Sequence, residues 1–204
     1  RGIPVVLVDR AVGLTDFCSV GDDDVEGGRL AVEHLLERGH RRLAFVGGPG
    51  SLAQVADRRR GADLALKAVP DATLLVISTP TLDVHSGSQA AGDVIALPPG
   101  ERPTAIFAAN DLLAIGLLQG FVLAGVRVPE EVAIIGYDDI AFAAAAAVPL
   151  SSIRQPRLQI GREAATMLFE EITASEDDAP HSHRTLRLTP DLVVRRSSSS
   201  RAQG

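Results

Sequence analysis

The sequence has few of the residues that would indicate a secreted or membrane protein. Its 204 residues include a single cysteine, Cys18, which cannot build a disulfide framework. This cysteine usage fits a reducing compartment, so we expect a cytoplasmic protein. No run of about 18 apolar residues occurs, and the sequence therefore predicts neither a membrane-spanning helix nor a membrane partner.

Positive charge is also scarce. Lys and Arg number 20 against 26 Asp and Glu, which gives a formal net charge of −6. Because affinity for nucleic-acid phosphates needs clustered positive charge, this balance argues against wholesale nucleic-acid binding by the chain itself. Hydrophobic residues make up 46% and charged residues 23%, proportions typical of a folded globular protein with one domain or two small ones.

The first and last residues of the sequence lead to two different predictions. The chain begins Arg1-Gly2-Ile3-Pro4, without a methionine and without the charged and apolar regions of a signal peptide. We interpret it as a piece of a longer protein. At the other end, residues 197–204 are rich in serine and are predicted to be disordered.

Short apolar runs alternate with helical patterns along most of the sequence. The runs lack strict polar alternation, as expected of parallel strands buried on both faces, and they cover residues 3–8, 43–46, 74–77, 105–108 and 132–135. Helices are predicted between them, starting near Asp23 or Asp24, at residue 53, at residue 86 and at Asn110 or Asp111. The strand starts recur about every 30 residues, the length of one strand–helix–strand unit. This pattern predicts a doubly wound α/β protein with parallel sheets.

The alternation changes after Tyr137. Residues 141–148 are rich in alanine and are interpreted as a short helix or a loop, and residues 151–154 as a brief extended segment. An amphipathic helix is predicted over residues 157–173, with Leu158 and Ile160 among its buried side chains. A last strand is predicted over residues 186–195.

Polar residues that follow the predicted strands are the candidates for ligand binding, because open parallel sheets bind ligands beyond the carboxyl ends of their strands. They are Asp9, Arg10, residues 47–50, Asn110, Asp111, Asp138 and Asp139. Carboxylate and amide oxygens accept hydrogen bonds and a guanidinium donates them, so this set suits a polyhydroxylated ligand. The alternative interpretation is structural: Asp111 and Asp139 cap helices and Asp9 occupies a turn.

The sequence contains only incomplete versions of the motifs that bind nucleotides or metals or that carry a catalytic nucleophile. The glycine-rich loop at residues 47–51 follows a strand but lacks the Gly-Lys-Ser/Thr ending of a phosphate loop, so no nucleotide cofactor is predicted. His181 and His183 have no cysteine or carboxylate at ligand spacing, and no metal site is predicted. Residues 22–24 are all aspartate and are interpreted as a helix cap. No nucleophile motif is present, which favours a protein that is not an enzyme.

The run Arg58-Arg59-Arg60 resembles a basic patch. On a helix, however, successive side chains point about 100° apart, so they cannot form one surface. We expect at most one of the three to face a cleft.

An ordered set of short stretches resembles the lac repressor (LacI/GalR) family of bacterial transcriptional regulators, in its effector-binding core. The stretches occur in family order and cover nearly the whole chain: residues 2–10, 34–49, 58–61, 103–111, 125–132, 135–139, 152–156 and 192–195. Each stretch alone is weakly specific, whereas the ordered set is highly specific.

The resemblance implies a fold like that of type I periplasmic binding proteins, with two doubly wound subdomains joined by three crossovers. The first subdomain would be incomplete and comprise residues 1–21 and 155–184, and the second would comprise residues 22–152 and 186–196. The helix-turn-helix that reads operator DNA in this family is absent from the chain, so operator DNA would be a partner of the whole protein. The family also implies a homodimer.

Carried over position by position, the effector contacts of the family fall on Asp9, Arg58, Asn110 and Asp138. Arg58 starts an Arg-x-x-Gly segment that is interpreted as a turn, and it is the residue that the resemblance adds to the strand-end candidates. These groups would hold sugar hydroxyls between the subdomains, and the effector would control operator binding allosterically without catalysis or a cofactor.

The sequence departs from the family pattern at three positions. Asp24 stands where Asn is usual, Ala62 where an aromatic residue is common, and Leu82 where many members place an aromatic residue that stacks on a sugar ring. The chain also has no tryptophan. These departures leave a nucleoside or another small polar metabolite open beside a sugar.

A periplasmic sugar-binding protein of an ABC transporter is the alternative within the same fold group. It would need an export signal upstream and would not bind operator DNA. The segments Gly39-His40-Arg41-Arg42 and Ser152-Ile153-Arg154-Gln155-Pro156 resemble the regulators more closely.

Overall fold

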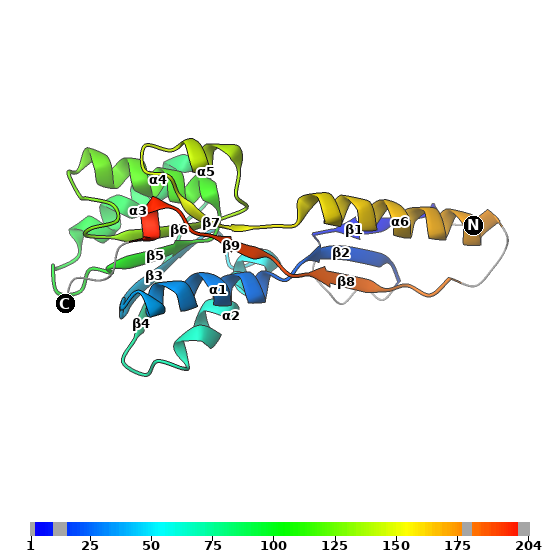
Figure 1. The fold of residues 1–204 in the computed structure, drawn as a ribbon, viewed down its shortest axis with the longest axis horizontal. Coiled ribbons are helices and arrows are strands. Elements are labelled where there is room, and N and C mark those ends of the chain that lie inside the picture. The colour runs from blue at the N-terminus through cyan, green and yellow to red at the C-terminus, as the bar shows by residue number, and fades with distance from the viewer. Residues whose placement is uncertain (1–2, 10–15, 177–180, 200–204) are drawn as a thin grey trace. The chain divides into compact units, whose positions relative to one another are not determined.

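The computed structural model describes residues 3–9, 16–176 and 181–199, and it divides into two compact units (Figure 1). The first unit comprises Arg1–Asp23 and Gln155–Pro190, and the second comprises Asp24–Arg154 and Asp191–Gly204. Each unit has its own sheet. Within the described residues, no helix is both long enough and apolar enough to cross a membrane.

The first unit is a parallel sheet covered by one long helix. Its strands lie in the order β1 (Val6–Val8), β2 (Cys18–Asp22) and β8 (Thr185–Leu188), and α6 (Arg157–Glu176) packs against β1 and β2. A small apolar core joins the helix to the sheet, formed by Cys18, Val20, Ile160, Met167 and Leu188.

Two features of this unit differ from the sequence prediction. The apolar pattern does not predict β2, because Ser19, Gly21 and Asp22 interrupt it. Leu158, predicted to be buried, is 90% exposed. It lies two residues from the buried Ile160, about 200° away around the helix, and therefore faces away from the sheet.

The second unit contains a six-stranded sheet. The strand order is β4 (Thr73–Ser78), β3 (Arg42–Gly47), β5 (Ala105–Ala108), β6 (Ala133–Tyr137), β7 (Ser151–Arg154) and β9 (Asp191–Val193). All neighbouring pairs are parallel except β7 and β9. The central strands β5 and β6 are buried throughout, which explains why their sequences are apolar without alternation.

Helices cover both faces of this sheet. Helices α1 (Asp24–Glu37) and α2 (Ala53–Leu66) pack together on one face, and α3 (Val84–Ala96) and α4 (Asp111–Leu123) pack together on the other (Figure 1). The alanine-rich segment forms a short helix, α5 (Ala141–Ala145). The prediction of a doubly wound parallel sheet is confirmed.

The strand order reverses between β3 and β5. From β3 the chain passes through α2 to β4 on one side, and it then returns through α3 to β5 on the other side. Helices α2 and α4, which follow β3 and β5, therefore lie on opposite faces of the sheet, and a topological switch point lies between the carboxyl ends of these two strands. Open α/β sheets bind ligands at this kind of topological switch point.

The last predicted strand, over residues 186–195, is two strands in the structure. Strand β8 pairs with β2 in the first unit, whereas β9 pairs with β7 in the second. Pro190 lies just before β9 and cannot donate a hydrogen bond to a strand ladder, which accounts for the break.

The predicted disorder of residues 197–204 does not hold for Ser197 and Ser198. Both are fully buried in a short 3-10 helix, Arg196–Ser198. The Ser197 hydroxyl donates to the Ile134 carbonyl at 2.6 Å, and the Ser198 hydroxyl bonds the Ser151 hydroxyl at 2.7 Å. Residues 200–204 lie outside the described residues.

Two glycines let α1 and α2 approach closely. A Cβ atom at Gly61 would lie 1.9 Å from the Val25 carbonyl oxygen, and one at Gly28 would lie 2.0 Å from the Arg58 carbonyl oxygen. The predicted Arg-x-x-Gly turn is therefore wrong: Arg58 and Gly61 both lie inside α2, and Gly61 serves helix packing. This contact places the beginning of α1 beside Arg58.

We predict that Gly61→Ala destabilises the protein by about 1–3 kcal/mol or more, because the added methyl group must push the two helix backbones apart. The matched control is Gly92→Ala in α3, where a Cβ meets nothing within 4 Å. This control is expected to stabilise the helix by about 0.5–1 kcal/mol. Urea unfolding midpoints measure both effects, and equal midpoints for the two variants would contradict the packing argument.

Candidate functional site

A buried arginine marks the carboxyl edge of the second unit's sheet. Arg58 lies in α2 and its side chain is only 8% exposed. It reaches the segments that follow β5 and β6, next to the switch point. The guanidinium therefore lies where a ligand of this sheet is expected.

Four contacts hold the Arg58 guanidinium. Its Nε donates to the Asp24 carboxylate at 2.7 Å, and its Nη1 donates to the Ala109 carbonyl at 2.7 Å. Nη1 also lies 3.9 Å from the Asp138 carboxylate. The guanidinium carbon lies 3.6 Å from the centre of the Tyr137 ring, within cation–π range.

These neighbours keep Arg58 charged although it is buried. Burial would lower the pKa of the guanidinium, but the opposing influence of Asp24, Tyr137 and Asp138 is greater and raises the pKa above its ordinary value. A guanidinium carries five N–H donors, and the two hydrogen bonds to Asp24 and Ala109 use two of them. The site thus presents a fixed positive group with further capacity to donate.

The expectation that at most one of the three adjacent arginines faces a cleft is confirmed. Arg59 and Arg60 have side chains 51% and 58% exposed, whereas Arg58 is buried. The two exposed arginines pair with Asp63 and Asp57 on the helix surface. Surface pairs of this kind contribute little to stability.

Asn110 is the N-cap of α4 and has a structural role. Its side-chain oxygen accepts a hydrogen bond from the Leu113 N–H at 2.9 Å, which caps the helix. Its amide nitrogen donates to the Leu82 carbonyl at 3.0 Å. The cap fixes the Asn110 side chain beside the switch point, and the amide group retains one further N–H.

Asp138 and Asp139 follow β6 in unusual backbone conformations. Their φ angles are +102° and +50°, in the region that L-residues rarely adopt. The Asp138 N–H donates to the Ile153 carbonyl at 2.8 Å, and the Asp139 N–H donates to the Ser152 hydroxyl at 3.0 Å. These bonds hold Asp138 with a side chain that is 31% exposed and close to Arg58.

The carboxylates of Asp139 and Asp111 each bind neighbouring groups of the protein other than Arg58. Arg154 and Arg195 each contact the Asp139 carboxylate at 2.7 Å. Asp111 is fully buried and accepts hydrogen bonds from the Ser152 hydroxyl and the Ile140 N–H. Burial raises the pKa of Asp111 to about 6, against the lowering influence of those two bonds. Their interactions join α4, β7 and the segment after β6.

Asp9 belongs to the first unit. It follows β1 with a φ of +50°, and its N–H donates to the Val20 carbonyl at 3.0 Å. The Asp9 carboxylate lies beside Gly21, where a Cβ atom would come within 3.2 Å of it. Its neighbour Arg10 lies outside the described residues. In the second unit, the structure brings Arg58 and Asp138 together, with Asn110 next to the Arg58-bound carbonyl of Ala109.

Asp24 is the site residue whose role the sequence does not reveal. Residues 22–24 read as a helix cap, and Asp24 does begin α1, but its carboxylate also binds a buried arginine 34 residues away. No sequence spacing connects two helices that meet only through packing. The one signal in the sequence is that Asp24 departs from the family pattern, in which Asn is usual at this position.

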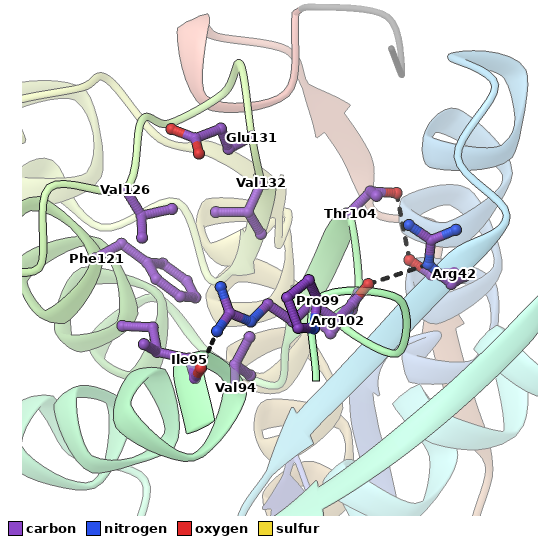
Figure 2. A pocket seen from close by; sticks show the side chains of 11 residues that line it. Arg42, Val94, Ile95, Pro99, Arg102, Thr104, Phe121, Val126, Glu131 and Val132 are labelled. Atoms are coloured by element: carbon purple, nitrogen blue, oxygen red, sulfur yellow. Dashed lines mark hydrogen bonds between the residues drawn. The ribbon is translucent and has the colours of Figure 1, made fainter. Parts of the chain in front are cut away.

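A separate pocket of about 200 Å³ lies at the opposite end of the same sheet (Figure 2). Arg102 extends between Val94, Ile95 and Phe121, and its guanidinium donates to the carbonyls of Ile95 and Leu97. Arg102 therefore satisfies the last carbonyls of α3, a common role for arginine at a helix C-terminus. This pocket is smaller than the usual range of about 300–1,000 Å³ for ligand sites.

The first unit contains a second polar cluster, which sequence spacing does not predict. His181 and His183 have no ligand-type neighbour in the sequence, but the structure brings Cys18 and Glu171 to them. The Cys18 sulfur lies 3.2 Å from His181 Nε2, and Glu171 Oε1 lies 3.4 Å from His183 Nδ1. Sequence spacing missed this cluster because its members lie on β2, α6 and the segment before β8.

Comparison with known proteins relates the chain to bacterial regulators. Residues 32–198 match the family described as periplasmic binding protein-like domain. The chain is 32% identical over 203 residues to the HTH-type transcriptional repressor PurR of Aliivibrio fischeri, and 34% identical over 202 residues to that of Edwardsiella ictaluri. It covers 58% and 57% of the lengths of these two repressors, and they cover 98% and 97% of the chain.

Solved structures of LacI-family regulators share the fold. A ribose-bound regulator from Enterococcus faecium aligns with a TM-score of 0.87 at 29% identity, over 98% of this chain and 72% of its own. A LacI-family regulator from Sanguibacter keddieii aligns with a TM-score of 0.87 at 32% identity, over 97% of this chain and 72% of its own. The regulator CelR in complex with cellobiose aligns with a TM-score of 0.84 at 34% identity, over 94% of this chain and 58% of its own.

We predict that Arg58→Met destabilises the second unit by about 3–5 kcal/mol, because it leaves the Asp24 carboxylate, 12% exposed, without its buried cation. Arg60→Met on the same helix is the control and is expected to change stability by less than about 0.5 kcal/mol. Chemical denaturation measures both variants. A stability for Arg58→Met as high as that of Arg60→Met would show that the buried pair does not support the unit.

Proposed function

Because the chain belongs to the LacI/GalR family of bacterial transcription regulators and carries its periplasmic-binding-protein-like core, we propose that it senses a small effector for a DNA-binding regulator. The effector binds at the carboxyl ends of the strands, and binding changes the affinity of the whole protein for operator DNA. The relatives are repressors and regulators, which favours this function over transport or catalysis.

The observation that carries the proposal is the Arg58 cluster. A charged guanidinium is buried at the topological switch point, held by Asp24 and the Ala109 carbonyl, with the partly exposed Asp138 carboxylate beside it. A fixed donor and a fixed acceptor at one strand edge match a ligand that carries hydroxyl groups. Because neither group needs to be ordered on binding, the ligand loses little affinity to reorganisation.

We propose a role for each candidate residue at this site. Arg58 donates to the ligand, Asp138 accepts from a hydroxyl, and Asn110 offers its remaining amide N–H. Asp9 of the first unit is proposed to contact the same ligand. A site that hydrogen-bonds a hydroxyl rejects an analogue lacking that hydroxyl by about 10⁴-fold or more, because its own polar groups are left unpaired.

The proposed effector is a sugar or a related polar metabolite. Two structural relatives are complexes with ribose and with cellobiose, which supports a polyhydroxylated ligand. Leu82 lies beside Gly48 and its carbonyl accepts from Asn110, so an aliphatic side chain stands near the site where the family commonly has an aromatic one. The absence of an aromatic face at this position leaves a nucleoside or another small polar metabolite as the alternative to a sugar.

Control of transcription follows from linkage. If the effector binds one conformation of the core more tightly, it shifts the population toward that conformation and changes operator affinity by the same coupling factor. A coupling free energy of about 1–3 kcal/mol changes operator affinity about 5- to 150-fold. DNA reading by a helix-turn-helix outside this chain, a homodimeric assembly and a cytoplasmic location are parts of the same proposal.

We predict that Asp138→Asn weakens effector binding about 10- to 100-fold, because a charge-assisted hydrogen bond contributes about 1.5–3 kcal/mol. Isothermal titration calorimetry of the full-length protein with ribose, cellobiose and ribonucleosides identifies the ligand and measures the loss. Affinity for operator DNA, selected from genomic fragments, is expected to stay unchanged without effector.

The control is Asp93→Asn, an exposed aspartate on α3, which is expected to bind effector normally. Equal effector affinities for Asp138→Asn and the natural protein would place the ligand elsewhere. If no operator is selected and sugar binding persists, the alternative of a periplasmic sugar-binding protein replaces the regulator.

A further inference from the structure

The cluster of Cys18, Glu171, His181 and His183 lies at one end of the first unit's sheet. Cys18 is the first residue of β2, and the two histidines lie just before β8 begins at Thr185. Because β2 and β8 are parallel, these positions share the amino-terminal edge of the sheet. Asp9 follows β1 at the carboxyl edge, so the cluster is separate from the proposed effector contacts.

We propose that Cys18, Glu171, His181 and His183 form a binding site for a divalent zinc-type ion. Each residue offers one ligand atom, and the four atoms all lie within 4.8 Å of one another. The set combines one thiolate, two imidazoles and one carboxylate. Zn²⁺ prefers nitrogen and sulfur ligands in a four-coordinate site, whereas Mg²⁺ and Ca²⁺ prefer oxygen ligands.

The spacing of the ligand atoms supports tetrahedral coordination. With Zn–S of about 2.3 Å and Zn–N or Zn–O of about 2.0–2.1 Å, the corners of a tetrahedron lie about 3.3–3.6 Å apart. The Cys18 sulfur is 3.2 Å from His181 Nε2 and 3.9 Å from His183 Nδ1. Glu171 Oε1 is 3.8 Å and 3.4 Å from the same two nitrogens. Small side-chain adjustments would therefore close the site around an ion.

The Glu171 carboxylate supplies a second, independent observation in favour of a bound ion. Its Oε2 atom accepts a hydrogen bond from the Val5 N–H at 3.0 Å, which fixes the orientation of the group. Its Oε1 atom is buried and accepts no hydrogen bond from any described residue, and the Glu171 side chain is only 8% exposed. A buried carboxylate oxygen without a partner is costly, and an ion bound between Oε1 and the two histidines would satisfy it.

An ion can reach the cluster from solvent. Glu171, His181 and His183 line a cavity of about 310 Å³, and the side chains of the two histidines are 19% and 34% exposed. Binding requires the Cys18 thiol to lose its proton to solvent while a metal–sulfur bond forms, and no oxidation state changes. The bound ion would tie β2, α6 and the segment before β8 together.

Cobalt substitution tests the proposal with a spectroscopic readout. Tag-free full-length protein is titrated with Co²⁺, and Zn²⁺ is then added as a competitor. We expect one Co²⁺ per chain with tetrahedral visible absorption and a near-ultraviolet sulfur-to-cobalt charge-transfer band, both removed by Zn²⁺. Because Cys18 is the only cysteine among these 204 residues, the difference spectrum between the natural protein and Cys18→Ser isolates its thiolate.

Two variants and a control decide the result. Cys18→Ser is expected to lose the charge-transfer band. The double variant His181→Gln/His183→Gln is expected to bind Zn²⁺ at least about 10- to 100-fold more weakly, because removal of a residue that only supports a metal ligand already causes a loss of that size. The double variant changes partly exposed side chains, so it remains informative if Cys18→Ser fails to fold. His85→Ala, an exposed histidine of the second unit, is expected to bind normally. An unchanged spectrum in Cys18→Ser, unchanged Zn²⁺ affinity in the double variant, or no Co²⁺ binding to the natural protein overturns the proposal.

Discussion

The buried Arg58 guanidinium is the interaction on which the second unit depends. It joins α2 to the first residue of α1 through Asp24, to the end of β5 through the Ala109 carbonyl and to β6 through the Tyr137 ring. Desolvating a charge this fully is expensive, and the cluster offsets the cost only because each partner is in place. The glycines at positions 28 and 61 make that possible, since they let α1 approach α2 closely enough for the Asp24 carboxylate to reach Arg58.

Much of this arrangement can be predicted from the sequence. Apolar runs without alternation identify β3, β4, β5 and β6. For β5 and β6 the reason is burial, because buried parallel strands need no polar face. Strand β4 lies at the edge of the sheet, where Leu75 is 40% exposed, so its apolar run predicts the strand but not its exposure. The polar residues that follow those strands include Asn110 and Asp138, and the family resemblance adds Arg58. What the pattern cannot assign is whether such a residue faces a ligand or a neighbour. Asp111 and Asp139 satisfy the same rule, yet their carboxylates bind Ser152 and the arginines of β7 and the segment after β9.

The features that the sequence does not reveal depend on long-range packing. Strand β2 is short and carries three small or polar residues, so its sequence does not predict a strand. It is recognised as one only through its pairing with β1 and β8. Likewise the ion pair of Asp24 with Arg58, and the approach of Cys18 and Glu171 to the two histidines, join segments with no common periodicity. The serine-rich end shows the same limit, because Ser197 finds buried partners that composition cannot anticipate.

The lack of space around Arg58 and Asp111 also constrains how this protein can evolve. A side chain at Gly136 would meet the Asp111 carboxylate at 2.1 Å, and one at Gly28 would meet the backbone of α2 at 2.0 Å. We therefore expect substitutions that add a side chain at Gly28 or Gly136 to be removed by selection for folding before they can alter ligand preference. Under the proposed assignment of the ligand site, a change of specificity is expected at Leu82, where a new side chain would alter what is recognised and leave the contacts of Arg58 intact.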